Sequence, residues 1–106
     1  MLVLKKNQIN ILDNFFLERF INSIKPQFKN YNSTQLEAII FESKYYEIDS
    51  GELIIKYIEI YTENIHVFSN KPKWLKYILT NHDYLPQDKI DYLTKKLLIK
   101  NGQYSN

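Results

Sequence analysis

The stretch KPKWLKYILTNHDYLP, residues 71–86, contains the only tryptophan of the chain and three lysines close to it. Its two prolines, Pro72 and Pro86, suit the first turn of a helix, where the missing backbone N–H is not needed. The spacing predicts a short helix from Pro72 to about Thr80, with Trp74 facing inward and the lysines outward. The apolar face of this helix consists of Trp74, Leu75, Ile78 and Leu79.

The N-terminal part of the chain carries one apolar stripe with the period of a helix, from about Lys6 to Ile24. Pro26 then ends or kinks this helix, because proline removes a backbone donor and clashes with the preceding turn. The stripe consists of Ile9, Leu12, Phe16, Phe20 and Ile24, widened by Leu17 and Ile21.

Two turn-rich stretches mark the starts of the next helices. Thr34 and Glu37 have the spacing of a capping box, which predicts a second helix to about Tyr46. Asp49 or Ser50 then caps a third helix. That helix presents an apolar face made of Leu53, Ile54, Tyr57, Ile58 and Tyr61.

The segment YIEIYTENIHVF, residues 57–68, fits a helix or a strand, because its β-branched residues alternate. We expect the helix to continue, although the pattern leaves residues 64–70 open between helix, strand and loop. The last helix carries Ile90, Leu93 and Leu97 on one stripe and is expected to stop at 101–102 (Asn-Gly). About five short helices with brief connections predict an all-α bundle that forms a single domain over residues 1–106.

The composition bounds the class of protein. A chain of 106 residues with 44% hydrophobic and 15% aromatic residues is typical of one packed domain. Cysteine is absent, which excludes disulfides and thiolate metal sites. No apolar run approaches the roughly 20 residues that cross a bilayer, and the start MLVLKKNQIN is too short in apolar residues for a signal peptide. We therefore expect a cytoplasmic protein that makes no use of the membrane.

Groups that carry catalysis are few. The two histidines, His66 and His82, lack the spacing of metal ligands. The only glycines, Gly51 and Gly102, are too far apart to form a phosphate-binding loop. The sequence therefore predicts that the protein is not an enzyme, with no catalytic residue, no cofactor and no metal site.

The net charge of +2 is unevenly distributed, with +3 in residues 1–30, −5 in 31–70 and +4 in 71–106. Nucleic-acid binding normally uses arginine, and Arg19 is the only one in the chain. Asp83, Asp88 and Asp91 dilute the lysines of the C-terminal part. Nucleic acid is therefore not the favoured partner, but a small DNA-binding regulator or antitoxin stays the alternative, and a structural subunit of a phage-like or secretion assembly is a third possibility.

The acidic middle of the chain supplies the candidate binding face. Its carboxylates and neighbouring tyrosines would suit a basic patch on a protein partner, because complementary charge steers encounter and tyrosine is enriched at interfaces. An ordinary solvated helix face explains the same residues. The candidates are Glu52, Tyr57, Glu59, Tyr61 and Glu63.

The order of segments resembles a family of small, mostly uncharacterised bacterial proteins encoded beside type VI secretion spike and effector genes. The segments are MLVLKKNQINIL, FLERF, YYEIDSGELIIKYIEI, KPKWLKYIL and KIDYLTKKL, which together span most of the chain. The resemblance implies a non-enzymatic role in a toxin gene cluster. The protein would then be an immunity protein that neutralises a cognate effector, or an accessory adaptor that helps to load one. It implies no role for any individual residue.

Overall fold

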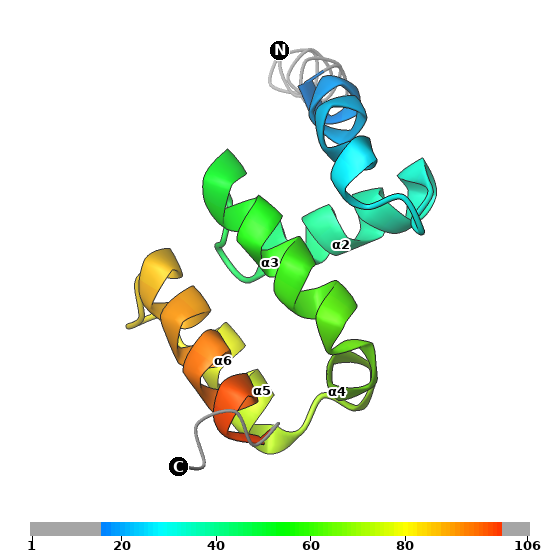
Figure 1. Cartoon of the computed structure of the whole chain (residues 1–106). Coiled ribbons are helices and arrows are strands. Elements are labelled where there is room, and N and C mark those ends of the chain that lie inside the picture. The colour runs from blue at the N-terminus through cyan, green and yellow to red at the C-terminus, as the bar shows by residue number, and fades with distance from the viewer. Residues whose placement is uncertain (1–15, 101–106) are drawn as a thin grey trace, which may run out of the picture. The chain divides into compact units, whose positions relative to one another are not determined.

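The computed structural model describes the backbone of residues 16–100 and the side chains of residues 16–97 (Figure 1). Within this range every regular element is a helix and no strand occurs, which confirms the prediction of an all-α fold. By its backbone contacts the chain divides into two compact units, Met1–Ala38 and Ile39–Asn106. The elements are a helix over residues 16–24, the 3-10 helix η1 (Lys25–Gln27), α2 (Ser33–Tyr45), α3 (Gly51–Glu63), α4 (Ile65–Asn70), α5 (Lys73–Thr80) and α6 (Pro86–Lys100).

The first unit contains the helix over residues 16–24, which tightens into η1 at Pro26. Its buried apolar side chains are Leu17, Ile21, Ile24, Phe28 and Leu36. Phe16, a member of the predicted stripe, is 61% exposed, so the prediction was wrong at this position. The buried face of the helix consists instead of Leu17, Ile21 and Ile24. Phe16 and Leu17 both fit an apolar stripe with helical spacing, so the sequence pattern did not show which of them packs inward. Ile9 and Leu12 lie outside the described residues.

The capping box of α2 forms two residues earlier than predicted. Asn32 Oδ1 accepts a hydrogen bond from the Gln35 N–H at 2.8 Å, and Gln35 Oε1 accepts one from the Asn32 N–H at 2.9 Å. Thr34 and Glu37 instead lie exposed within the helix. Asparagine caps a helix as well as serine or threonine does, so Asn32 and Gln35 satisfy two free backbone donors at the actual start of the helix.

The second unit is built around α3, α5 and α6. α6 packs against both α3 and α5, and α4 packs against the end of α3, as Figure 1 shows with α3 in green and α6 in orange. The ring of Phe68 from α4 lies edge-on to Tyr57, with a centroid distance of 5.6 Å, and 5.0 Å from the centroid of Tyr61. The helical core residues of this unit are Ile39, Ile40, Ile54, Tyr57, Ile58, Phe68, Leu75, Leu79, Ile90, Leu93 and Leu97.

The ambiguous segment 64–70 is helical, as we expected, but it forms a separate helix. Ser50 caps α3, with its Oγ accepting a backbone hydrogen bond at 3.4 Å. α3 then ends at Glu63, and the Asn64 side-chain amide donates to the Ile60 carbonyl at 2.9 Å. The asparagine satisfies a free carbonyl at the helix end, and α4 restarts directly after it.

In α5 the buried residues are Leu75 and Leu79, which are 0% and 1% exposed. Trp74 was predicted to face inward as the packing anchor, but it is only half-buried. The Lys96 Nζ lies 5.9 Å from the centroid of the Trp74 ring, within the range of a cation–π contact. The tryptophan thus lies at the edge of the apolar face, where spacing alone cannot distinguish it from the centre.

The predicted stripe of α6 is confirmed, because Ile90, Leu93 and Leu97 are at most 4% exposed. Tyr92, placed beside that stripe, is 43% exposed. The expected stop at 101–102 lies outside the described residues.

Replacing Leu75 with alanine should lower the free energy of unfolding by about 2 to 5 kcal/mol, because the side chain is fully buried and its loss leaves a cavity. Urea denaturation followed by circular dichroism measures the change. Leu85→Ala is the matched control, since Leu85 is 67% exposed and its loss should cost less than about 0.5 kcal/mol. Equal costs at the two positions would contradict the assignment of the core.

Candidate functional site

A groove with a volume of about 530 Å³ lies between α3 and α6. Its apolar lining comes from Ile60, which is half-buried, and Ile90, which is 3% exposed. Around these side chains stand three carboxylates and two ammonium groups. The lining residues are Lys56, Glu59, Ile60 and Glu63 from α3, and Ile90, Asp91, Thr94 and Lys95 from α6.

Helix geometry explains why these side chains meet. Glu59 and Glu63 are four residues apart, so they lie one above the other on α3. Asp91 and Lys95 have the same spacing on α6, which packs against α3. In the described part of the chain neither Glu59 nor Glu63 makes an ion pair, so both carboxylates are available to a ligand.

The structure gathers only some of the residues that were predicted to bind a partner. Glu59 and Glu63 line the groove, whereas Glu52 is exposed in the first turn of α3 and does not line it. Tyr61 is half-buried against Phe68. Tyr57 is 0% exposed, so its ring belongs to the core and does not reach the surface where a partner would bind. Its place on the apolar stripe of α3 explains this position.

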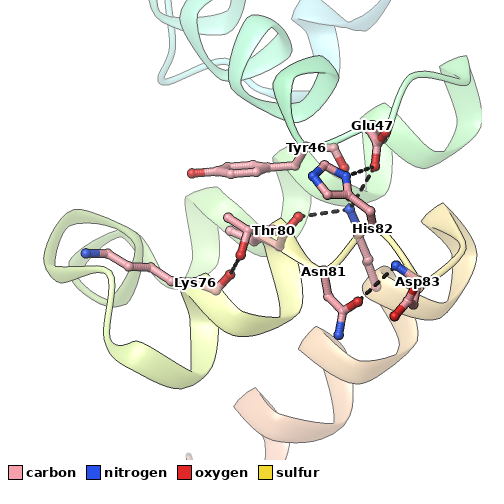
Figure 2. Close-up of polar contacts among 9 residues, drawn as sticks. Tyr46, Glu47, Lys76, Thr80, Asn81, His82 and Asp83 are labelled. Carbon is pink, nitrogen blue, oxygen red and sulfur yellow. Dashed lines mark hydrogen bonds and ion pairs between the residues drawn. The ribbon is translucent and has the colours of Figure 1, made fainter.

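A second polar cluster surrounds Lys89, which is 1% exposed. Its neighbours Tyr46, Glu47 and His82 are labelled in Figure 2. The Lys89 Nζ donates to the backbone carbonyls of Tyr46 and Leu79, each at 2.8 Å. The Glu47 Oε1 lies 3.7 Å from the same ammonium and 3.0 Å from the His82 Nδ1. A buried ammonium is stable only when hydrogen bonds and opposite charge replace its lost hydration, and this cluster supplies both.

The cluster also sets the acidity of Glu47. The hydrogen bond to the His82 ring, followed by the charges of His82 and Lys89, lowers the pKa of Glu47 below its usual value of 4.5. Figure 2 shows the two side chains turned toward one another from separate turns. Glu47 itself has a φ of 68°, in the left-handed region that few residues other than glycine adopt.

This cluster was not predicted from the sequence, because lysine side chains are usually exposed and Lys89 is one of several lysines in the C-terminal part of the chain. A signal was present in the spacing, since Lys89, Leu93 and Leu97 follow one another in steps of four and so share the buried side of α6. The Glu47 and His82 contacts join residues 35 positions apart in sequence, and no local pattern indicates such a pair.

The hydroxyl of Tyr57 is the one buried side-chain polar atom that makes no hydrogen bond of normal geometry in the described part of the chain. Burial, followed by the negative charge of the nearby Glu42, raises the pKa of Tyr57 above its usual value of 10.0. Glu42 instead accepts a hydrogen bond from the Lys71 Nζ at 2.7 Å. The Glu42 carboxylate thus pairs with the Lys71 ammonium and also lies near the Tyr57 hydroxyl.

Neither cluster has the makeup of a metal site. The described residues include no group of three histidine, cysteine, aspartate or glutamate side chains that could hold a metal ion. Their helices also include none that is long and apolar enough to cross a bilayer. What the groove offers is an open surface with an apolar floor and charges of both signs, which suits a polypeptide segment.

Replacing Glu47 with glutamine should reduce stability at neutral pH and have little effect in acid. The pKa of Glu47 is lower in the folded chain than in the unfolded chain, so its contribution is present above pH 4.5. This contribution is lost as the pH falls through the folded-state pKa. Urea denaturation of both proteins at a series of pH values measures the difference, and parallel curves down to the most acidic point would contradict the assigned role.

Replacing Tyr57 with phenylalanine should leave the free energy of unfolding unchanged or raise it by up to about 1 kcal/mol, because it removes a buried hydroxyl that lacks a partner. Tyr92→Phe is the matched control, since Tyr92 is 43% exposed, and it should change stability by less than about 0.5 kcal/mol. A loss well above 1 kcal/mol for Tyr57→Phe alone would mean that the hydroxyl does bond to Glu42.

The chain was compared with protein-family models, curated proteins and solved structures. No protein-family model, no curated protein and no solved structure matches the chain. The resemblance to proteins of type VI secretion gene clusters therefore stays a prediction. The groove between α3 and α6 is the structural feature that bears on function.

Proposed function

We propose that this chain is a cytoplasmic, non-enzymatic protein-binding module whose groove between α3 and α6 receives a segment of a partner protein. The observation that carries the proposal is the groove itself, which surrounds apolar side chains with the carboxylates of Glu59, Glu63 and Asp91. Apolar surface inside a charged rim is the usual arrangement of a protein interface.

The charges of the groove indicate the chemistry of the partner. Three carboxylates face two ammonium groups, so the groove favours a segment that presents basic side chains. The carboxylates would repel the phosphates of a nucleic acid, which supports a protein partner. Lys56 and Lys95 in the same lining can pair with an acidic residue of the partner and so fix its register.

The resemblance to proteins encoded beside secretion spike and effector genes supplies the biological role that we propose. The partner would be a secreted toxic effector that this chain neutralises, or a spike component onto which it helps to load an effector. Both roles need a surface that binds protein and neither needs catalysis. Affinity capture from the native bacterium distinguishes them, because a toxic domain alone indicates immunity and a spike protein indicates an adaptor.

Reversing both charges with Glu59→Lys and Glu63→Lys should weaken partner capture by roughly tenfold or more, because each change places a positive charge against the basic segment of the partner. The melting temperature should change little, since both side chains are exposed and unpaired among the described residues. Titration of the captured partner against the purified chain measures the affinity.

The matched control is Glu18→Lys with Glu37→Lys, which changes the net charge equally at exposed positions of the first unit. Capture by this control should equal that of the natural chain. If both double variants lose the partner equally, the effect is one of net charge and the groove is not the binding site. Unaltered capture by the Glu59 and Glu63 variant would remove the groove from consideration altogether.

A further inference from the structure

A run of exposed and half-buried aromatic rings crosses α5, the loop after it and α6. We call it the aromatic face, and it consists of Trp74, Tyr77, Tyr84 and Tyr92. The ring centroids of Tyr77 and Tyr84 are 6.2 Å apart, and those of Tyr84 and Tyr92 are 4.9 Å apart. Tyr77 is 62% exposed, and Leu85, which follows Tyr84 in sequence, is 67% exposed. Tyrosine and tryptophan in an exposed cluster are typical of surfaces that a protein partner covers.

Two lysines mark one end of the aromatic face. Lys96 lies one helical turn after Tyr92, and its Nζ is 5.9 Å from the centroid of the Trp74 ring. Lys73 directly precedes Trp74 and lies one turn before Tyr77. Both lysines are exposed. This end of the face, near the start of α5, is therefore basic.

Two aspartates mark the other end. Asp83 directly precedes Tyr84, and its charge helps to raise the pKa of Tyr84 after a larger effect of the Tyr77 hydroxyl. Asp88 lies in the first turn of α6, one turn before Tyr92. α5 and α6 pack together across the short connection 81–85, so they run in opposite directions. The aspartates thus lie at the loop, at the opposite end of the face from the lysines.

A face with this polarity is complementary to itself. A two-fold rotation about its centre brings the basic end of one copy onto the acidic end of the other, and it brings aromatic rings onto aromatic rings. We propose that the aromatic face is a dimer interface and that its occupant is a second copy of this chain. Lys73 and Lys96 of each copy then meet Asp83 and Asp88 of the other.

Two other charged residues of α6 do not alter the polarity of the aromatic face, because Asp91 and Lys95 line the groove toward α3. The chemistry of the face also favours a second copy over a nucleic acid. A nucleic acid would stack on the rings but would place phosphates against the two aspartates. The proposed dimer leaves the α3 and α6 groove open to its own partner, and it does not depend on the function of that groove.

The first experiment measures the oligomeric state of the full chain at low ionic strength. Sedimentation equilibrium from roughly 1 μM to 1 mM should show a monomer passing into a dimer. Trp74 is the only tryptophan, so its emission should shift to shorter wavelength over the same range as the ring loses water. A chain that stays monomeric throughout overturns the proposal and assigns the face to a different protein or to nucleic acid.

The second experiment reverses the charges of one end at a time. Lys73→Glu with Lys96→Glu makes both ends acidic, and Asp83→Lys with Asp88→Lys makes both ends basic. Each double variant alone should dimerise roughly tenfold or more weakly than the natural chain, because like charges then meet across the two-fold axis. Dimerisation of both variants at the natural strength overturns the proposed face.

An equal mixture of these two variants provides the sharper test. In a mixed dimer the acidic replacement at position 96 of one chain faces the basic replacement at position 88 of the other, and the two remaining natural ends also attract. The mixture should recover a dimer with one chain of each kind, which mass spectrometry of the intact complex identifies. Folding of each variant is checked by circular dichroism, and two folded variants that fail to associate when mixed overturn the proposal.

The matched control is Lys25→Glu with Lys29→Glu, which makes the same change of net charge at exposed positions of the first unit. This control should dimerise as the natural chain does and should gain nothing from mixing with the basic variant. Equal weakening in the control would mean that net charge, and not the aromatic face, governs association.

Discussion

The buried ammonium of Lys89 is the constraint on which the second unit depends. A lysine that is 1% exposed has lost its hydration, and the carbonyls of Tyr46 and Leu79 replace that water at 2.8 Å each. These two carbonyls belong to the turn after α2 and to the end of α5, so the lysine of α6 joins three segments at one point. The cost of leaving a charge buried without partners is large, so arrangements that keep Lys89 buried but remove these carbonyls from it are unfavourable.

With α6 held in this way, one of its exposed sides lines the groove and the other contributes to the aromatic face. Asp91 and Lys95 face α3 and line the groove, while Tyr92 and Lys96 face α5 and the aromatic face. Because one rigid helix carries both sets, the spacing between the two surfaces is fixed by helix geometry. A dimer formed through the aromatic face would then present two grooves to two partner segments, which increases the effective affinity for a repetitive partner.

Local patterns predicted most of the helices, because caps and apolar spacing act over a few residues. The cap of α3 was predicted as Asp49 or Ser50, and Ser50 is the cap. The stripe of Ile90, Leu93 and Leu97 was found from its spacing. Errors in burial arose where neighbouring apolar residues fit the same helical spacing. Phe16 is exposed while Leu17 is buried, and Trp74 lies at the edge of its helix face rather than at the centre. Of the candidate site, Glu59 and Glu63 were identified from charge alone. The groove and the Lys89 cluster were not predicted, because they depend on which helices meet.

Between residues 16 and 100, two residues other than glycine adopt the left-handed backbone conformation, Glu47 with φ 68° and Lys71 with φ 47°. Each side chain makes a long-range hydrogen bond, Glu47 with His82 and Lys71 with Glu42, across 35 and 29 positions of sequence. The conformation costs on the order of 1 kcal/mol at each turn. Local hydrogen bonds offset part of this cost, such as the bond from the Ser43 Oγ to the Ile48 carbonyl and the bond from the Lys71 Nζ to the Phe68 carbonyl. The distant partners add to these local bonds, so each turn is more stable within the folded unit than in an isolated fragment. Each contact couples its turn to a segment 29 or 35 positions away in sequence, which favours cooperative folding of the second unit over independent helical hairpins.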